Sequence, residues 1–208
     1  MMEKECRFCN IINNNIDTYG VVDRPFLSNK DFFSLVSIGA FIFGWTLIIP
    51  KEHVYNLSQY YGNEEFRKYL HRHIELLRNR LQWNKKIILF EHGANSCNSL
   101  TACGTCHAHL HTVPFNGSIL ESIIKDKTWH LVECAKVAEF VQEKEYLLYC
   151  ETSNLQENTE VYIHIIEKPE SQYFRRILAE EIGLEGEYNY NLDARLEQSV
   201  EIMKLLGE

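Results

Sequence analysis

Three histidines at alternate positions, His107, His109 and His111, form the stretch of this sequence best suited to chemistry. Side chains two residues apart lie on the same face of a β-strand, so the spacing predicts three imidazoles in a row. Ala108 and Leu110 would then point into a core. Neutral histidine is seldom the best choice for a packed core or a solvated surface. Such a row therefore indicates metal binding, or phosphoryl or acyl chemistry.

A CxxC pair, Cys6 and Cys9, opens the chain and fits one half of a zinc site. Thioredoxin-like redox use would need the pair to open a helix in a βαβ setting, which nothing in the sequence indicates. The other two ligands come from one of two pairs: Cys103 with Cys106, or His53 with His107. Strand alternation favours the histidines, because Cys106 faces away from the site if His107 faces it.

Apolar periodicity predicts the elements that must hold these residues in place. Apolar side chains recur at helical spacing over residues 64–82, which predicts a long amphipathic helix. His71 and His73 lie two apart on it, cannot share a face, and are expected to be solvated. Alternation and turn residues predict strands at 19–22, 31–36, 45–50, 86–90 and the histidine stretch.

Residues near the histidines could hold a substrate. Glu91 and His92 directly follow a buried strand and precede a glycine, which is typical of the lip of a site. The segment 94–103 is small and polar and suits contacts with phosphate. The expected donors to a phosphoryl group are the ring of His111, the side chains of Asn95, Asn98 and Ser99, and the backbone N–H groups around Gly104 and Thr105.

In the second half of the chain, the sequence pattern predicts a helix at 129–142 and strands at 145–150 and 161–166. Two further helices are expected, the first at 170–182 and the second from Asp193 to Leu206. These elements bury little alone, so residues 116–208 are expected to pack against a domain formed by residues 1–115 rather than fold independently. Arg175 stands at the start of one of these helices, where a cation and free N–H groups could hold a distal phosphate.

Composition limits the classes of function. The net charge of −8 disfavours a nucleic-acid polymer as partner, because phosphate contacts require clustered Lys and Arg. No apolar run reaches the ~20 residues that span a bilayer, and no apolar signal segment opens the chain. We therefore expect a cytoplasmic protein that engages no membrane. Whether it forms a homodimer stays open.

The middle of the sequence resembles the histidine-triad superfamily. The resemblance rests on Pro50-Lys51-Glu52-His53, on the helix and strand that follow, and on the stretch HAHLHTVP, and it covers roughly residues 6–115. It implies an α+β fold, with an antiparallel sheet of about five strands and a long amphipathic helix. The remaining residues would form a C-terminal α/β extension packed on it.

The resemblance also implies an activity and site residues. His109 is similar to the nucleophile that attacks the α-phosphorus of a nucleotide, and His111 to the residue that contacts the α-phosphate. His107 resembles either the residue whose ring orients the nucleophile or, in branches with an N-terminal CxxC, a zinc ligand. In those branches Cys6, Cys9 and His53 would complete the zinc site.

Histidine at position 111 favours the hydrolase side of the superfamily, because the nucleotidyltransferases resemble His-x-His-x-Gln. We thus expect a nucleotide hydrolase or phosphoramidase that cleaves at the α-phosphate through a covalent nucleotidyl-histidine. The alternatives are a nucleotidyltransferase or phosphorylase, and a low-turnover nucleotide-binding regulatory module. The family commonly has an aspartate that binds ribose where this chain has Ser37.

Overall fold

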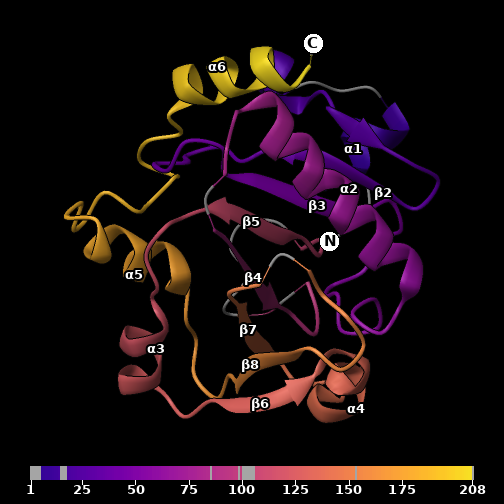
Figure 1. Ribbon diagram of the computed structural model, residues 1–208, viewed down its shortest axis with the longest axis vertical. Coiled ribbons are helices and arrows are strands. Elements are labelled where there is room, and N and C mark those ends of the chain that lie inside the picture. The colour runs from indigo at the N-terminus through magenta and orange to yellow at the C-terminus, as the bar shows by residue number, and fades with distance from the viewer. Residues whose placement is uncertain are drawn as a thin grey trace.

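A computed structural model describes residues 6–14, 18–84, 86–97, 99, 106–152 and 154–207 of the 208. Eight strands in these ranges form one sheet, in the order β1-β2-β3-β5-β4-β7-β8-β6, and every neighbouring pair is antiparallel. The strands are β1 (Leu27–Ser28), β2 (Phe32–Val36), β3 (Thr46–Pro50), β4 (Ile87–Gly93), β5 (Leu110–Pro114), β6 (His130–Glu133), β7 (Tyr146–Cys150) and β8 (Glu160–Ile165). Figure 1 shows β5 and β4 near the centre, with β7, β8 and β6 below them.

Helices cover both faces of the sheet. They are α1 (Arg7–Asn14), α2 (Glu64–Arg80), α3 (Leu120–Asp126), α4 (Val137–Val141), α5 (Tyr173–Glu181) and α6 (Leu196–Leu206), with short 3-10 turns η2 (Gly20–Asp23) and η3 (Cys134–Lys136). Apolar residues of α2, α4 and α6 pack together on one face, in the largest core cluster. The expected α+β class, with an antiparallel sheet and a long amphipathic helix, is confirmed.

The opposite face carries two smaller apolar clusters. One consists of Phe8 and Ile11 of α1 packed against the side chains of β2 and β3 that point to this face, which are Phe33, Leu35, Leu47 and Ile49. The other joins α3 and α5 to β4, β5 and β7, and contains Trp45 and Phe90. The pocket that contains His109 and His111 lies on this face, with α1 and α5 contributing to its wall.

Helix α2 begins and ends where its sequence provides caps. The side chain of Asn63 accepts hydrogen bonds from the backbone N–H groups of Glu65 and Phe66, which have no partner within the helix. Two glutamates occupy the first turn and two arginines the last, in the arrangement that suits the helix dipole. The chain leaves the helix at Gln82, which has a φ of 51°.

The structure corrects four expectations. Residues 20–23 form the turn η2 rather than a strand, because the side chain of Asp23 accepts the N–H of Tyr19 and holds the chain in a turn. Residues 130–133 form strand β6, which pairs with β8, where we expected the start of a helix. The histidine strand begins at Leu110, because the N–H of Ala108 bonds to a loop carbonyl rather than to a strand.

His73 is the fourth correction. Its side chain is fully buried rather than solvated, and its ring nitrogens contact the hydroxyls of Ser34, Thr46 and Thr112 at 2.8–2.9 Å. Burial lowers the pKa of His73 to about 3, so the ring is neutral. His71 is exposed, as expected.

The sheet continues across the sequence position at which we expected one domain to end. Strands β1 to β5 lie within residues 27–114, and β7 pairs directly with β4 over five residue pairs from Leu89 to Gly93. The second half of the chain therefore extends the sheet of the first half. Within the described residues, no helix has both the length and the apolar character needed to cross a membrane.

Candidate active site and metal centre

Strand β5 positions the histidines between two partners. Leu47 of β3 pairs with His111 on one side, and Phe90 of β4 pairs with it on the other. Because β5 lies inside the sheet, its backbone is held by hydrogen bonds on both edges. His111 is thus fixed at the centre of the sheet, while His107 and His109 stand in the segment that leads into the strand.

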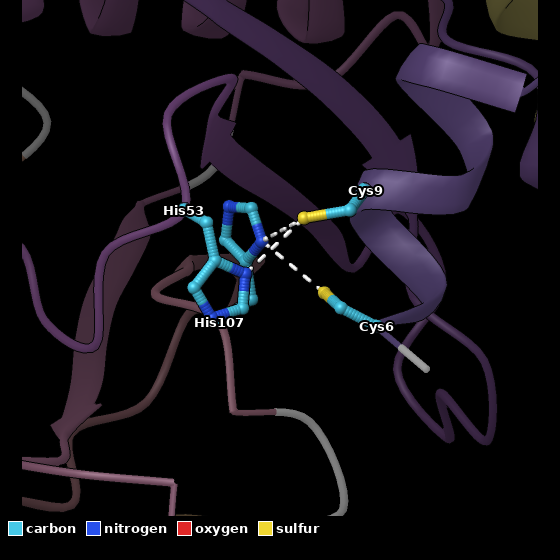
Figure 2. Close-up of side chains that lie close together, drawn as sticks. All are labelled: Cys6, Cys9, His53 and His107. Carbon is cyan, nitrogen blue, oxygen red and sulfur yellow. Dashed lines mark hydrogen bonds between the residues drawn. The ribbon is translucent and has the colours of Figure 1, made fainter. Parts of the chain in front are cut away.

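Four residues from three parts of the chain converge beside this segment. Cys6 and Cys9 come from the start of α1, His53 from the turn after β3, and His107 from the approach to β5 (Figure 2). One ligand atom of each lies within 4.8 Å of the ligand atoms of all the others. Two thiols and two imidazoles in this arrangement form a group that could hold a metal ion.

The hydrogen bonds orient His107 toward the cysteines. Its Nε2 donates to the carbonyl of Pro50 at 2.8 Å, so the proton is on Nε2 and the lone pair is on Nδ1. Nδ1 lies 3.3 Å from the Sγ of Cys6 and 3.6 Å from that of Cys9, while Nδ1 of His53 lies 3.1 Å from Cys9. Burial lowers the pKa of His107 to about 4, which favours the neutral ring that a metal requires.

His109 is held by the backbone of the residue two positions before it. Its Nδ1 lies 2.9 Å from the carbonyl oxygen of His107, so Nδ1 carries the proton and Nε2 the lone pair. Burial lowers the pKa of His109 and keeps the ring neutral. His109 therefore has the tautomer of a nucleophile, with an acceptor already in place for the charge that attack would create.

His111 has the complementary arrangement. The indole N–H of Trp45 donates to its Nδ1 at 2.9 Å, which leaves the proton on Nε2. The ring is stacked on Phe90, with centroids 4.5 Å apart, and its centroid is 4.8 Å from that of His109. Burial, together with the positive charge of Arg175, keeps the pKa of His111 well below its ordinary value. His111 is a neutral hydrogen-bond donor.

A pocket of about 300 Å³ opens onto His109 and His111. Its wall contains two cations, Arg7 from α1 and Arg175 from α5, and no carboxylate among the described residues. The other lining residues are Phe8, Thr18, Tyr19, Ser37, Ile38, Leu47, Tyr190 and Asn191. Arg7 is bonded to the buried carboxylate of Asp23, and Cζ of its guanidinium lies 4.9 Å from the centroid of the Tyr19 ring. The pocket suits an anionic ligand with an apolar or aromatic part.

Known proteins were compared with this chain. It matches no protein-family model, and no curated protein matches it. Solved structures match at low identity. A Hit-like protein involved in cell-cycle regulation from Bartonella henselae is 18% identical, with 54% of this chain and 77% of that chain covered and a TM-score of 0.40. A HIT-family protein from Bacillus subtilis is 20% identical, with coverages of 55% and 75% and a TM-score of 0.39.

A hypothetical histidine triad nucleotide-binding protein from Sulfolobus tokodaii is 16% identical, with 98% of this chain and 97% of that chain covered and a TM-score of 0.37. The chain is similar to HIT, or histidine-triad, proteins.

The structure brings some of the expected substrate-binding residues to the pocket at His109 and His111 and leaves others elsewhere. Arg175 lines the pocket, and His92 lines a small adjoining cavity together with His111. Asn95 and Ser99 line a different surface groove, beside β8 and Lys144. Gly104 and Thr105, like Asn98 and Cys103, lie outside the described residues.

Glu91 lies on the opposite face of the sheet from His109, because it alternates with Phe90 along β4. Its carboxyl group is fully buried and accepts hydrogen bonds from the N–H of Leu57 and the hydroxyls of Tyr61 and Tyr146. This arrangement makes it a core residue rather than a residue of the site lip.

Sequence reasoning missed several residues that shape the pocket at His109 and His111. Trp45, directly before β3, and Phe90 of β4 contact His111, and Tyr190 reaches the pocket from the C-terminal segment. The flanking strands were predicted, so strand pairing could have suggested the first two residues. Nothing in the local sequence marks Tyr190.

Proposed function

We propose that this chain is a histidine-triad hydrolase that cleaves a nucleotide at its α-phosphate, with His109 as the nucleophile. The observation that carries the proposal is the hydrogen bond from Nδ1 of His109 to the carbonyl of His107, beside the neutral Nε2–H of His111. One ring offers a lone pair and the next offers a donor, on one side of a pocket with cations in its wall.

In the first step, Nε2 of His109 attacks the α-phosphorus. A P–N bond forms, the bond from phosphorus to the leaving oxygen breaks, and its electron pair departs with the leaving group. The positive charge on the His109 ring is shared with the carbonyl of His107 through the Nδ1 proton. The Nε2–H of His111 donates to a phosphoryl oxygen, where negative charge gathers.

In the second step, water attacks the phosphorus of the nucleotidyl-histidine. The P–N bond breaks, its electron pair returns to Nε2 of His109, and the water proton passes to solvent. The products are a nucleoside monophosphate and the free enzyme. Because Trp45 already donates to Nδ1 of His111, that ring acts as a donor and not as a proton source. A phosphoric anhydride, whose leaving group departs unprotonated, therefore suits the site better than a phosphoramidate.

We further propose that zinc is the metal held by Cys6, Cys9, His53 and His107. Two thiolates and two neutral imidazoles are the donors of structural zinc sites, and four protein ligands leave no open position for substrate. A histidine that binds a metal through one ring nitrogen usually donates its other ring N–H to a carbonyl or carboxylate, and the hydrogen bond from Nε2 of His107 to the carbonyl of Pro50 is of this kind. The ion would join α1 to the segment before β5.

The test combines turnover with a trapped intermediate. The wild-type chain is mixed with a dinucleoside polyphosphate, a nucleoside phosphoramidate and an adenylylated amine, and mononucleotide release is measured. The reaction is quenched in alkali, and mass spectrometry of the intact protein then tests for one added nucleotidyl group. His109→Ala should abolish the adduct and lower turnover on the order of 10³-fold or more.

His71→Ala is the matched control, since His71 is an exposed histidine on α2 and should leave both readouts unchanged. Equal mononucleotide release from the wild type and His109→Ala would overturn the covalent mechanism. Tight nucleotide binding without turnover by the wild type would instead favour the regulatory binding module.

A further inference from the structure

Helix α5 is connected to His111 through two aromatic side chains, Phe90 and Trp45. The first contact runs from Phe174 to Phe90, with ring centroids 4.7 Å apart and planes inclined by 30°. Phe90 in turn stacks on His111 at 4.5 Å with planes 20° apart. All three rings lie on the same face of the sheet, and Phe174 and Phe90 are buried, so the imidazole plane is fixed by packing.

The second contact runs from Arg175 through Trp45. Cζ of Arg175 lies 4.8 Å from the centroid of the Trp45 ring, within the range of a cation–π interaction. Trp45 is fully buried and donates its N–H to Nδ1 of His111. The guanidinium therefore packs on the indole whose N–H bonds to Nδ1 of His111 and leaves the proton on Nε2.

Arg175 is itself anchored by neutral acceptors. Its Nε donates to the carbonyl of Tyr188 at 2.8 Å, and one of its terminal nitrogens donates to the carbonyl of Gly39. The side chain is only 6% exposed. Gly39 has a φ of 63°, and a Cβ there would overlap Tyr190, so glycine is required where the segment 188–190 crosses this loop.

We propose that Phe174 and Arg175 are positioning residues, which fix the ring plane and the tautomer of His111 from the C-terminal part of the chain. This inference rests on the proposed function for its kinetic consequence but not for its structural one. It differs from a direct contact between Arg175 and a distal phosphate, because the effect passes through Trp45. A neutral His111 with its proton on Nε2 is ready to donate to a phosphoryl oxygen.

The test reads the histidine tautomer in the free protein, with no substrate present. Nitrogen-15 NMR of the side chain distinguishes a protonated from an unprotonated ring nitrogen. The wild type should show Nε2 protonated and Nδ1 unprotonated at His111. Arg175→Met, which keeps the aliphatic stem and removes the charge, should give a mixture of tautomers, and Trp45→Phe should do the same.

Arg176→Met is the matched control. Arg176 is the next residue of α5, is partly exposed, and pairs with Glu170 and Glu180 rather than with Trp45. Its loss should leave the His111 signals unchanged. If Arg175→Met does not fold, Arg175→Lys is measured in its place. It should also give a mixture of His111 tautomers, because one ammonium group cannot reproduce the contacts of the planar guanidinium with both carbonyls and the indole.

Kinetics then separate positioning from substrate binding. Phe174→Leu should lower kcat about tenfold or more while KM changes less than about threefold, because a misplaced group costs rate rather than affinity. Arg175→Met should lower kcat similarly and should also raise KM, because it removes a cation from the pocket wall. A rise in KM with unchanged kcat and unchanged His111 signals would overturn the inference in favour of direct phosphate contact. Wild-type signals in a folded Arg175→Met or Arg175→Lys would also overturn it.

The two proposals can fail separately. If the wild type turns over no nucleotide, the hydrolase proposal falls while the NMR comparison still decides whether α5 fixes His111. If turnover depends on His109 but substitution of Arg175 does not change the His111 tautomer, the hydrolase proposal is supported and the positioning role of Arg175 is contradicted.

Discussion

Buried histidines of this chain differ in what their ring nitrogens contact. Nδ1 of His107 faces two thiols, Nδ1 of His109 donates to a carbonyl, and Nδ1 of His111 accepts from an indole. The ring nitrogens of His73 contact the hydroxyls of Ser34, Thr46 and Thr112. Residue type alone gives each of them the same pKa and the same two nitrogens. Their partners fix a different tautomer or role for each ring.

His73 should contribute to stability and not to activity. His73→Ala leaves a cavity and removes one hydrogen-bond partner from each of three buried hydroxyls, so the free energy of unfolding should fall by about 2–4 kcal/mol. Urea unfolding followed by circular dichroism measures this loss.

The control for this change is His71→Ala on the same helix. His71 is exposed, so its replacement should change the unfolding free energy by no more than about 0.5 kcal/mol. Similar effects of the two substitutions would contradict the buried placement of His73.

At the scale of elements, Glu91 connects three parts of the fold. From β4 it accepts bonds from Leu57 in the loop before α2, from Tyr61 in the same loop, and from Tyr146 of β7. Burial raises the pKa of Glu91 to about 7. The three hydrogen bonds lower the pKa, but their effect is smaller than that of burial. The carboxyl group thus changes charge near neutral pH within a packed interior.

Stability should therefore depend on pH through Glu91. Its folded pKa lies above the value of 4.5 for an ordinary glutamate, so its contribution is present below pH 4.5 and is lost as pH rises through about 7. The loss is on the order of 3 kcal/mol across that window. Glu91→Gln should remove this part of the pH dependence in urea unfolding series.

Glu197→Gln serves as the control for Glu91, because Glu197 is an exposed glutamate in the first turn of α6. It should leave the pH dependence as in the wild type. A Glu91→Gln profile that runs parallel to the wild type between pH 4.5 and 7 would contradict the titration of a buried carboxyl group.

Helix α1 is short and is held to the sheet by contacts of several kinds. Phe8 and Ile11 pack on β2 and β3, Arg7 is bonded to Asp23, and the two cysteines face His53 and His107. A bound ion would add a further link between α1 and the segment before β5.

Metal content should follow the cysteine pair. Zinc measured by elemental mass spectrometry should be about one per chain in the wild type and well below that in Cys9→Ser, since one ligand of four is weakened. Removal of zinc by a chelator should speed hydrogen exchange in α1.

Cys134→Ala is the control for the metal site, because Cys134 is buried in the large core away from the cluster. It should bind zinc as the wild type does. Unchanged zinc in Cys9→Ser would rule out the cysteine pair as ligands.

At the scale of the whole molecule, the pocket joins segments that are far apart in sequence. Arg7 and Tyr19 come from the first tenth of the chain, His109 and His111 from its middle, and Tyr190 from near its end. Strand β7 also supplies the second edge partner of β4. The two halves of the chain therefore share one sheet and one site.

A chain truncated to residues 1–115 should not fold into a stable domain. It would leave β4 without β7 and would expose Ile88 and Phe90, which α5 and β7 cover in the full chain. We expect a poorly dispersed NMR spectrum and no cooperative thermal transition, with the full chain under the same conditions as the control. A cooperative, well-dispersed 1–115 fragment would show that the first half is independent.

The sequence by itself indicated most of the sheet, the long helix and the candidate site residues. Period-two and period-3.6 patterns are local, so α2, β2, β3, β4, β7 and β8 could be predicted within a few residues. The CxxC pair and the alternating histidines were likewise visible, and strand alternation favoured His53 and His107 over Cys103 and Cys106. Two wrong predictions of secondary structure, at residues 20–23 and 130–133, fall where a side-chain bond or a distant strand pairing decides the local structure.

The tertiary structure decided what each of these residues contacts. Burial on one face or the other separated Glu91 from His109, and the pairing of β3 and β4 with β5 brought Trp45 and Phe90 to His111. The packing of α5 on that face then brought Phe174 and Arg175 to those two aromatic rings. Such contacts join residues up to about 130 positions apart and depend on the whole packed chain rather than on local pattern.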